Sequence, residues 1–283
     1  MISFERQQRL VALLRQEPGI KVSDLAVRLG VSQGTVRNDL DALERAGKLS
    51  RVRGGAVLRD ETQFVSPSFA ERALVNAEKK QRIARVAATL VEDGDSILMD
   101  ASTTVFAMIP FLKNRRSLTI LTNSLSVGMA LSQNPMHTVI LIGGIIRPGG
   151  DSVTGPLSEQ VLRSLHVKTA FVSCSGISIK AGLTEIDIRE VDVKRQMIRC
   201  AERVVALVDA SKFGKVDLSS FASLNQISHL FTDSEIPQDF ADYFKSACIP
   251  VTVCGEEAIS SQIPCEEEGE IPSAASTIEV PQD

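Results

Sequence analysis

The chain of 283 residues is longer than a typical single domain of ~100–200 residues, which favours one large domain and a smaller one. Eleven Phe, one Tyr and no Trp argue against an aromatic-lined site for sugars or single-stranded nucleic acid, and no apolar run reaches the ~18 residues of a membrane helix. Residues 1–59 carry 11 Lys and Arg against 6 Asp and Glu, whereas residues 256–283 carry 8 acids and no base. We therefore expect a basic head that contacts a polyanion and an acidic, disordered tail.

The cysteines and histidines follow no metal-binding or disulfide pattern. The three histidines stand apart, and the five cysteines include no CxxC pair and no even set. The first ten residues carry charges and no apolar signal core. We expect a cytoplasmic protein in a reducing compartment, with no structural metal, no cofactor and no membrane segment.

Residues 1–59 contain three short helical patterns followed by a hairpin pattern. The second helix is expected to begin with Ser23 as its N-cap and to end at Gly30. After a three-residue turn, the third helix is expected over Gln33–Ala46. Residues 49–58 then predict two short strands beside the helices. The sequence therefore predicts a winged helix-turn-helix.

The outward face of the third helix carries side chains that suit the major groove of DNA. Gln33 and Arg37 lie one turn apart; Gln pairs well with adenine, and Arg pairs with guanine or phosphate. Hydroxyls at the helix start and arginines on the wing suit the DNA backbone. The alternative is a solvated helical surface on a protein-interaction module. The candidate DNA-binding residues are Ser32, Gln33, Thr35, Arg37, Asn38, Arg51 and Arg53.

Residues 60–74 predict a linker, and residues 75–255 alternate between helical and apolar strand patterns. Helices are expected over 78–92, Ser124–Ser132, Leu157–Leu165, Arg189–Ala201 and Gln238–Ala247. Strands are expected over Ser96–Met99, Leu118–Leu121, Thr138–Ile142, Thr169–Ser173, Val204–Val208, His229–Thr232 and Pro250–Val253. Continuous apolar strands that alternate with helices predict an α/β domain with a mainly parallel sheet covered on both faces.

Polar residues and glycines gather just after four of these strands, where ligands of open α/β sheets bind. Hydroxyls and N–H groups at a helix start can accept a phosphate, a lysine can add a charge, and Asp or Asn can fix sugar hydroxyls. Each feature alone is more often an ordinary cap, turn or surface lysine. Together they predict a site for a small phosphorylated molecule, with candidates Asp100, Ser102, Thr103, Thr104, Asn123, Gly143, Gly144 and Lys212.

The head resembles the winged helix-turn-helix of the DeoR family of bacterial transcription regulators, on the run VSDLAVRLGVSQGTVRNDLDALERAGKLSRVRGGA. It departs from the family pattern at Asn38, where a second Arg is usual, and at Arg53, where His is usual. The body is similar to the DeoR-family sensor domain on LMDASTT, Thr122-Asn123-Ser124, Gly143-Gly144, Gly155, FVSCSGIS, Lys194 and Asp209–Gly214. This resemblance implies a fold like ribose-5-phosphate isomerase and CoA-transferases, a phosphorylated sugar as inducer, and a homo-oligomer.

Two functions remain open at this point. One is a ligand-controlled repressor that binds a double-stranded DNA operator; the other is a sugar-phosphate isomerase-like enzyme with a DNA-binding head. Glu190 and Lys194 lie one turn apart and complete the candidate effector site, where they could supply acid–base chemistry with Asp100. The alternative for this pair is an exposed i,i+4 contact on a helix. Without a Ser-His-Asp order, a metal cluster or a Walker motif, the sequence favours the regulator.

Overall fold

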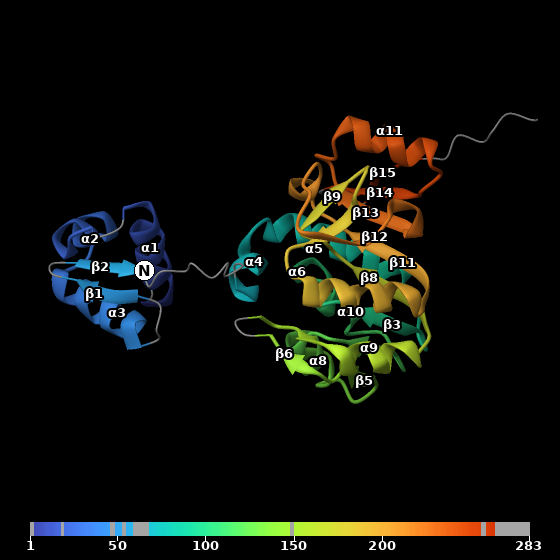
Figure 1. The fold of residues 1–283 in the computed structure, drawn as a ribbon, viewed down its shortest axis with the longest axis horizontal. Helices are drawn as coiled ribbons and strands as arrows, with labels where there is room; N and C mark the ends of the chain where they lie inside the picture. Colours follow the sequence, from blue (N-terminus) through green and yellow to red (C-terminus); the bar gives the residue numbers. More distant parts are fainter. Residues whose placement is uncertain are drawn as a thin grey trace, which may run out of the picture. The chain divides into compact units, whose positions relative to one another are not determined.

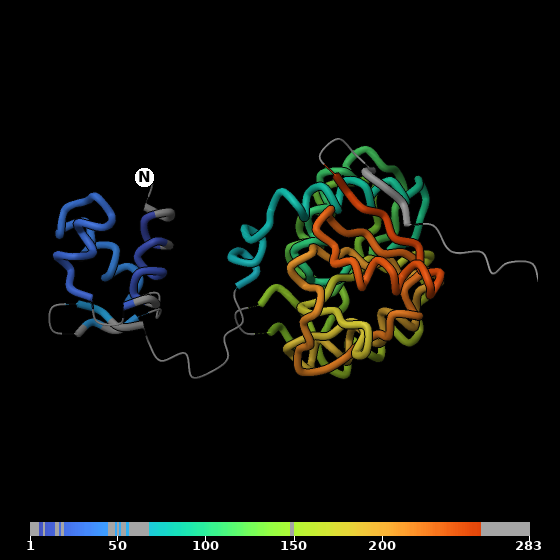
Figure 2. The backbone as a smooth tube through the Cα atoms, turned by 90° about the horizontal axis from the view of Figure 1, so that it is seen from above, coloured from blue at the N-terminus to red at the C-terminus, as the bar shows by residue number. Residues whose placement is uncertain are grey.

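The computed structural model describes residues 3–17, 20–45, 49–52, 55–58, 68–147, 150–255 and 259–263. The chain divides into two compact units, residues 1–66 and 67–283. In Figures 1 and 2 the first unit is blue and the second runs from cyan to red. Each unit has an apolar core of its own.

The first unit is a three-helix head with a two-stranded wing. Buried side chains from all three helices and the wing form its core, including Leu10, Leu14, Leu25, Val36, Leu40 and Leu49. The predicted winged helix-turn-helix is confirmed. Its elements are α1 (Ser3–Gln16), α2 (Val22–Leu29), α3 (Gln33–Arg45), and the antiparallel pair β1 (Leu49–Val52) and β2 (Gly55–Leu58).

The start of α2 differs from the sequence prediction. Lys21 is the N-cap in place of Ser23, because Val22 is buried in the head core and joins the helix. Ser23 instead donates its hydroxyl to the side chain of Asp24 at 3.1 Å. The predicted end holds, since Gly30 adopts the left-handed conformation (φ +64°) that glycine tolerates best.

The second unit is built on a large sheet, whose described strands follow the order β15-β14-β13-β11-β8-β3-β4-β5. Neighbouring strands are parallel except for β14 and β15. The predicted strands are confirmed, with ends shifted by a few residues. Their bounds are β3 (Ser96–Met99), β4 (Thr119–Thr122), β5 (Thr138–Leu141), β8 (Val167–Val172), β11 (Ala201–Leu207), β13 (His229–Asp233) and β14 (Val251–Cys254). The edge strand β15 (Ile259–Ile263) was not predicted.

Helices cover both faces of this sheet, as predicted. One core holds Ile97 and Met99 and the other holds Leu98, so the two cores lie on opposite faces of the sheet. The first is covered by α5 (Ala77–Ala87), α6 (Thr103–Phe106), α7 (Ile109–Leu112) and α8 (Leu125–Leu131). The second is covered by α9 (Pro156–Arg163), α10 (Ile188–Arg199) and α11 (Gln238–Ser246). None of the helices in the described part of the chain has the length and apolarity that crossing a bilayer requires.

Several short elements had no counterpart in the sequence prediction. β9 (Gly176–Ser178), β10 (Gly182–Glu185) and β12 (Ser219–Ala222) form a small antiparallel sheet, and β6 (Ile145–Ile146) pairs with β7 (Val153–Thr154). The remaining turns are the 3-10 helices η1 (Ala88–Leu90), η2 (Ala210–Lys212) and η3 (Leu224–Gln226).

The segments expected as linker and tail contain regular structure. Residues 69–74 of the expected linker form α4 (Phe69–Leu74), which begins with a capping box between Ser68 and Glu71. The prediction of disorder is wrong for Ile259–Ile263, because this stretch extends the sheet as β15 beside β14. Residues 59–67 and 264–283 lie outside the described part.

The direction of strand addition reverses between β3 and β8. The chain adds β4 and β5 on one side of β3, and then adds β8, β11, β13 and β14 on the other side. Loops diverge at such a reversal and leave a crevice beyond the carboxyl ends of the strands, where open α/β sheets bind their ligands.

Candidate functional site

The start of α3 presents the predicted DNA-contacting side chains. Gln33, Arg37 and Asn38 are exposed, as a helix that enters the major groove requires. Ser32 is also exposed, and its Oγ accepts the N–H of Thr35 at 3.1 Å and lies 2.9 Å from the Thr35 hydroxyl. The Ser32 hydroxyl therefore caps α3 in the free protein, with the Thr35 hydroxyl as its neighbour.

A buried carboxylate that sequence reasoning missed fixes α3 to α1. Asp39 is 4% exposed and accepts hydrogen bonds from Arg6 Nε at 2.5 Å and from Gln7 Nε2 at 3.3 Å. The hydrogen bond with Asp39 raises the pKa of Arg6. Asp39 carried no signal beyond its place in the family motif, yet it orients the face of α3 that carries Arg37.

The wing is also tied to α3. The Arg51 guanidinium lies 2.5 Å from Asp41, and its backbone N–H donates to Glu44 Oε1 at 3.0 Å. In the free protein, the Arg51 guanidinium is therefore paired with Asp41 of α3. Arg53, the other candidate on the wing, lies outside the described residues.

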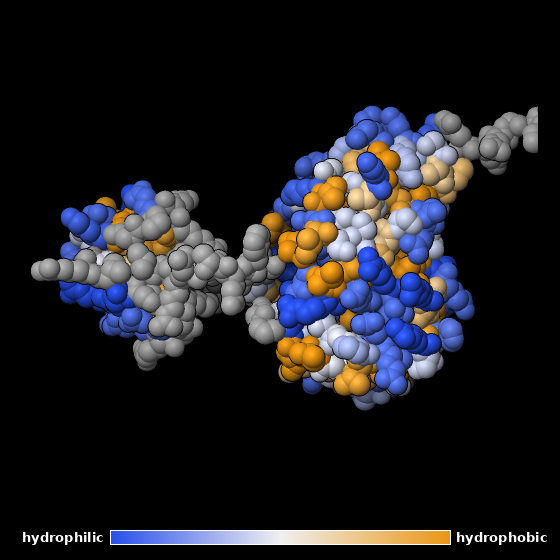
Figure 3. All heavy atoms as spheres, in the orientation of Figure 1, coloured by the Kyte–Doolittle hydropathy of each residue, from blue (hydrophilic) through white to orange (hydrophobic). Residues whose placement is uncertain are grey.

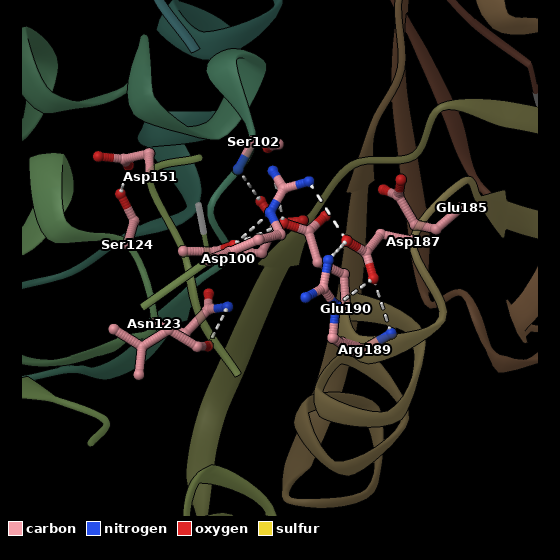
Figure 4. Close-up of polar contacts among 12 residues, drawn as sticks. Asp100, Ser102, Asn123, Ser124, Asp151, Glu185, Asp187, Arg189 and Glu190 are labelled. Carbon is pink, nitrogen blue, oxygen red and sulfur yellow. Dashed lines mark hydrogen bonds and ion pairs between the residues drawn. The ribbon is translucent and has the colours of Figure 1, made fainter. Parts of the chain in front are cut away.

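Asp100 lies at the reversal point, directly after β3, and is fully buried. Its carboxylate accepts the N–H of Ser102 at 3.0 Å and the N–H of Ser173, which follows β8, at 2.9 Å. Lys194 Nζ on α10 lies 3.1 Å from the same carboxylate. Asp100 thus joins β3, β8 and α10, and Figure 4 shows it between Asn123 and the acidic residues near α10.

Lys194 is held by three oxygen atoms and an aromatic ring. Besides Asp100, its ammonium contacts Glu185 Oε1 at 2.5 Å and the carbonyl of Ser173 at 2.7 Å, and it lies 4.9 Å from the ring centre of Phe221. Burial lowers the pKa of Lys194, but Asp100 and Glu185 outweigh burial and raise it. Burial also raises the pKa of Glu185 against the opposing effect of Lys194.

The alternative that Glu190 and Lys194 form an exposed contact on their helix is wrong. Both side chains are buried, because this face of α10 packs against the carboxyl ends of the sheet. Glu190 accepts a hydrogen bond from Ser152 at 2.6 Å and pairs with Arg147 at 3.1 Å. Arg147, in the turn that joins β6 to β7, was missed because only the two glycines of its loop were singled out.

The residues that follow β4 and β5 include a buried oxygen atom without a hydrogen-bond partner and a backbone position that faces open space. Asn123 is 3% exposed; its Nδ2 donates to the carbonyl of Val153 at 3.2 Å, and its Oδ1 is buried without a partner. A Cβ added at Gly143 would meet no atom within 4 Å, so the backbone there faces open space. At Gly144 (φ +148°) a Cβ would overlap Ser158, so the packing of its own chain already requires glycine there.

The remaining candidates also follow strands of the large sheet, after β3 and after β11. Thr103 and Thr104 are buried, and Ser102 caps α6 by accepting the N–H of Val105 at 3.2 Å. Lys212 is half-buried in η2 and acts electrostatically on the buried Cys174 beside β8, as do Asp100 and Lys194. In the described residues, no group of three or more His, Cys, Asp or Glu is placed to hold a metal.

Comparison with known proteins identifies the family. Residues 75–234 match the DeoR C terminal sensor domain, and residues 6–62 match the DeoR-like helix-turn-helix domain. The chain belongs to the DeoR family. This DeoR-family protein is therefore a DNA-binding transcriptional regulator.

Its relatives are similar over nearly their whole length. The HTH-type transcriptional regulator GolR of Listeria innocua is 36% identical over 89% of this chain and 99% of its own. The HTH-type transcriptional repressor GlcR of Bacillus subtilis is 36% identical over 84% and 92%. The putative aga operon transcriptional repressor of Escherichia coli is 30% identical over 89% and 94%.

Among solved structures, ribose 5-phosphate isomerase A of Methanocaldococcus jannaschii matches 49% of this chain and 55% of its own, with 20% identity and a TM-score of 0.36. A likeness of this extent carries no argument about the activity of this DeoR-family protein.

Proposed function

We propose that this protein acts in the cytoplasm as a homo-oligomeric repressor of a carbohydrate-catabolism operon. A phosphorylated sugar or related metabolite, bound at the carboxyl ends of the sheet, releases it from a double-stranded DNA operator. Two relatives that are named repressors support this direction of control. A relative named L-fucose operon activator, 32% identical over 84% of this chain, supports activation as the second candidate.

The observation that carries the proposed site is the buried oxygen of Asn123, which has no hydrogen-bond donor. Such an oxygen costs ~1–3 kcal/mol of stability, and a sugar hydroxyl can supply the missing donor. The open space at Gly143 leaves room for a ligand beside it. An unmet acceptor at the end of a strand therefore favours a polyhydroxy ligand.

The charges of the crevice favour a phosphate on that ligand. Lys194 is offset by Asp100 and Glu185, and Arg147 is offset by Glu190. Within the described part of the chain, the side chain of Lys212 makes no hydrogen bond or ion pair, so its charge is available to an anion. We assign the phosphate to Lys212 and the N–H groups after β3, and the sugar hydroxyls to Asn123.

Release from DNA requires the ligand to bind one arrangement of the sensor unit better than another. A coupling of ~1–3 kcal/mol changes operator occupancy ~5–150-fold. The ends of β3 and β8 are joined through Asp100 to α10, so a ligand at this point contacts both sides of the sheet reversal.

The test combines ligand binding with operator binding. A panel of pentose and hexose phosphates, with inorganic phosphate as a reference, is screened for a rise in the melting temperature of the full chain. The compound that raises it is then added to the complex with promoter DNA. Lys212→Ala is expected to retain DNA binding and to lose the response to the sugar phosphate by at least about tenfold.

Lys215→Ala is the matched control, because Lys215 is exposed three residues further along the same loop. A response that Lys212→Ala and Lys215→Ala retain equally contradicts the assigned phosphate position. Steady isomerisation of any sugar phosphate favours the enzyme alternative, in which Asp100, Glu190 and Lys194 supply acid–base chemistry.

A further inference from the structure

A pocket of about 450 Å³ lies beside the small antiparallel sheet of the second unit. The turn between β9 and β10, residues of β12 and η3, and Tyr243 of α11 line it. Figure 3 shows hydrophobic atoms among hydrophilic ones over the region of α11 and β9, which Figure 1 labels. Small-molecule sites usually measure roughly 300–1,000 Å³. The pocket therefore has the volume to hold a small organic molecule.

This pocket is separate from the candidate effector site. Of the described residues that line it, none is a candidate effector residue. Gly182, which lines the pocket, is the first residue of β10, whereas Glu185, which contacts Lys194, is the last. Since each residue of a strand adds ~3.3 Å, the two places lie ~10 Å apart along β10. Phe221 is shared, because it lines the pocket and its ring centre lies 4.9 Å from the Lys194 ammonium.

Four lining residues carry hydrogen-bond donors that meet no acceptor in the described part of the chain. The backbone N–H of Ser223 donates to Gln226 Oε1 at 3.0 Å, and the Ser223 hydroxyl donates to Asn225 Oδ1 at 2.5 Å. A backbone N–H can only donate, so the Gln226 oxygen faces Ser223 and the NH₂ group is left over. The Lys180 ammonium and the Tyr243 hydroxyl likewise make no hydrogen bond or ion pair among the described residues.

The charge of the lining favours a singly charged anion. Lys180 is exposed, and none of the lining residues that the structure describes is Asp or Glu. A carboxylate accepts hydrogen bonds from an ammonium, an amide NH₂ group and a hydroxyl, and the charge-assisted bond to the ammonium is the strongest of them. One ammonium balances one negative charge, which suits a carboxylate better than a phosphate dianion. The apolar lining residues Ile179, Phe221 and Leu224 offer contact to a hydrocarbon group.

We propose that this pocket is a second ligand site, which binds a small carboxylic acid with an apolar body. The Lys180 ammonium and the NH₂ groups of η3 bind the carboxylate, and the Tyr243 hydroxyl adds a further donor. The apolar body packs against Phe221 and Leu224. The second site does not rest on the proposed function, because it shares no residue with the sugar phosphate position.

The chain carries its own probe for this pocket. Tyr243 lines it and is the single tyrosine of a chain without tryptophan, so its fluorescence reports binding there. The test compound is cyclohexanecarboxylate, and cyclohexylmethanol is its uncharged counterpart of nearly the same shape. The full chain is expected to bind the acid with a Kd below about 1 mM and to bind the alcohol at least about tenfold more weakly.

Two variants at exposed positions locate the carboxylate. Lys180→Met removes the ammonium and is expected to weaken binding of the acid at least about tenfold. Gln226→Glu keeps the oxygen to which Ser223 donates but places a negative charge beside the carboxylate, and a similar loss is expected. Lys215→Met is the matched control, because Lys215 is exposed and lies outside the lining, and it is expected to bind the acid like the unmodified chain. Circular dichroism shows whether each variant is folded.

Each outcome decides the proposal without reference to the sugar phosphate. Equal binding of acid and alcohol overturns it, and so does an unchanged fluorescence up to about 10 mM of the acid. Folded Lys180→Met and Gln226→Glu proteins that bind the acid as Lys215→Met does also overturn it. Loss of acid binding in Lys212→Ala alone places the acid in the crevice and refutes a second site. Acid binding that Lys180→Met abolishes, in a chain that answers to no sugar phosphate, supports the pocket and contradicts the proposed function alone.

Discussion

Replacing Asp100 by Ala tests whether the centre of the crevice is a structural ion pair. A carboxylate that served only the ligand could be removed without loss of stability. In the structure, Asp100 is fully buried, pairs with Lys194 at 3.1 Å and accepts two backbone N–H groups. Its removal leaves the N–H groups of Ser102 and Ser173 without this acceptor and leaves Lys194 with Glu185 as its remaining carboxylate.

The expected loss is large. Breaking a buried ion pair by removing one partner costs ~3–5 kcal/mol, a substantial share of the ~5–15 kcal/mol that stabilises a typical protein. Asp100→Asn is not expected to rescue the fold, because one carboxylate oxygen becomes an NH₂ donor opposite another donor. In the double variant Asp100→Ala, Lys194→Met the buried cation is also gone, so the two losses are expected to be non-additive by ~1–3 kcal/mol.

The chain offers a selective probe for this measurement. It contains one tyrosine and no tryptophan, and Tyr243 lies on α11 in the second unit. Tyrosine fluorescence during urea unfolding therefore reports the sensor unit alone, which matters because two-unit chains need not unfold in one step. Asp239→Ala, at an exposed position of α11, is the control and is expected to stay within ~0.5 kcal/mol of the unmodified chain. Equal midpoints for Asp100→Ala and Asp239→Ala would refute the ion-pair argument.

Two further variants address the head and the buried lysine of α5. Arg37→Ala is expected to weaken operator binding by ~1–3 kcal/mol, measured by fluorescence anisotropy, and to leave the response to ligand intact. The control is Lys113→Ala, far along the chain, and an equal loss of operator binding in this variant would contradict the prediction. Burial lowers the pKa of Lys80 to about 8, so the native protein loses this proton while the unfolded chain keeps it up to the ordinary value near 10.5. The free energy of unfolding should therefore rise with pH above about 8 relative to Lys80→Met, measured by circular dichroism; parallel pH profiles would contradict this.

The head could be predicted almost completely because its signals are local. Helix periodicity, the cap at Ser32 and the turn at Gly30 lie within a few residues of the structure they specify. The strands of the large sheet were equally visible, since parallel strands buried on both faces are continuous apolar runs. In the described part of the head, the N-cap of α2 was misplaced, because burial of Val22 depends on the folded core.

The small sheet, and the buried contacts that Glu190 and Lys194 make, could not be predicted from the sequence. β9 and β10 are three and four residues long, and their pairing depends on a turn at Gly182 (φ +70°) that packs against Ala222 of β12. Glu190 and Lys194 have the spacing of an exposed helical pair. Which side of α10 is buried follows from its packing across the sheet ends, and no local pattern encodes that packing.

The burial of Lys194 also decides which cation can recognise a ligand. An ammonium that contacts Asp100, Glu185 and the carbonyl of Ser173 has its hydrogen-bonding capacity filled, so a phosphate could reach it only by displacing a carboxylate. Lys212 has no such competitor within the described residues. The sheet reversal therefore uses Lys194 to hold β3, β8 and β10 together, and Lys212 is the cation that we propose binds the anion.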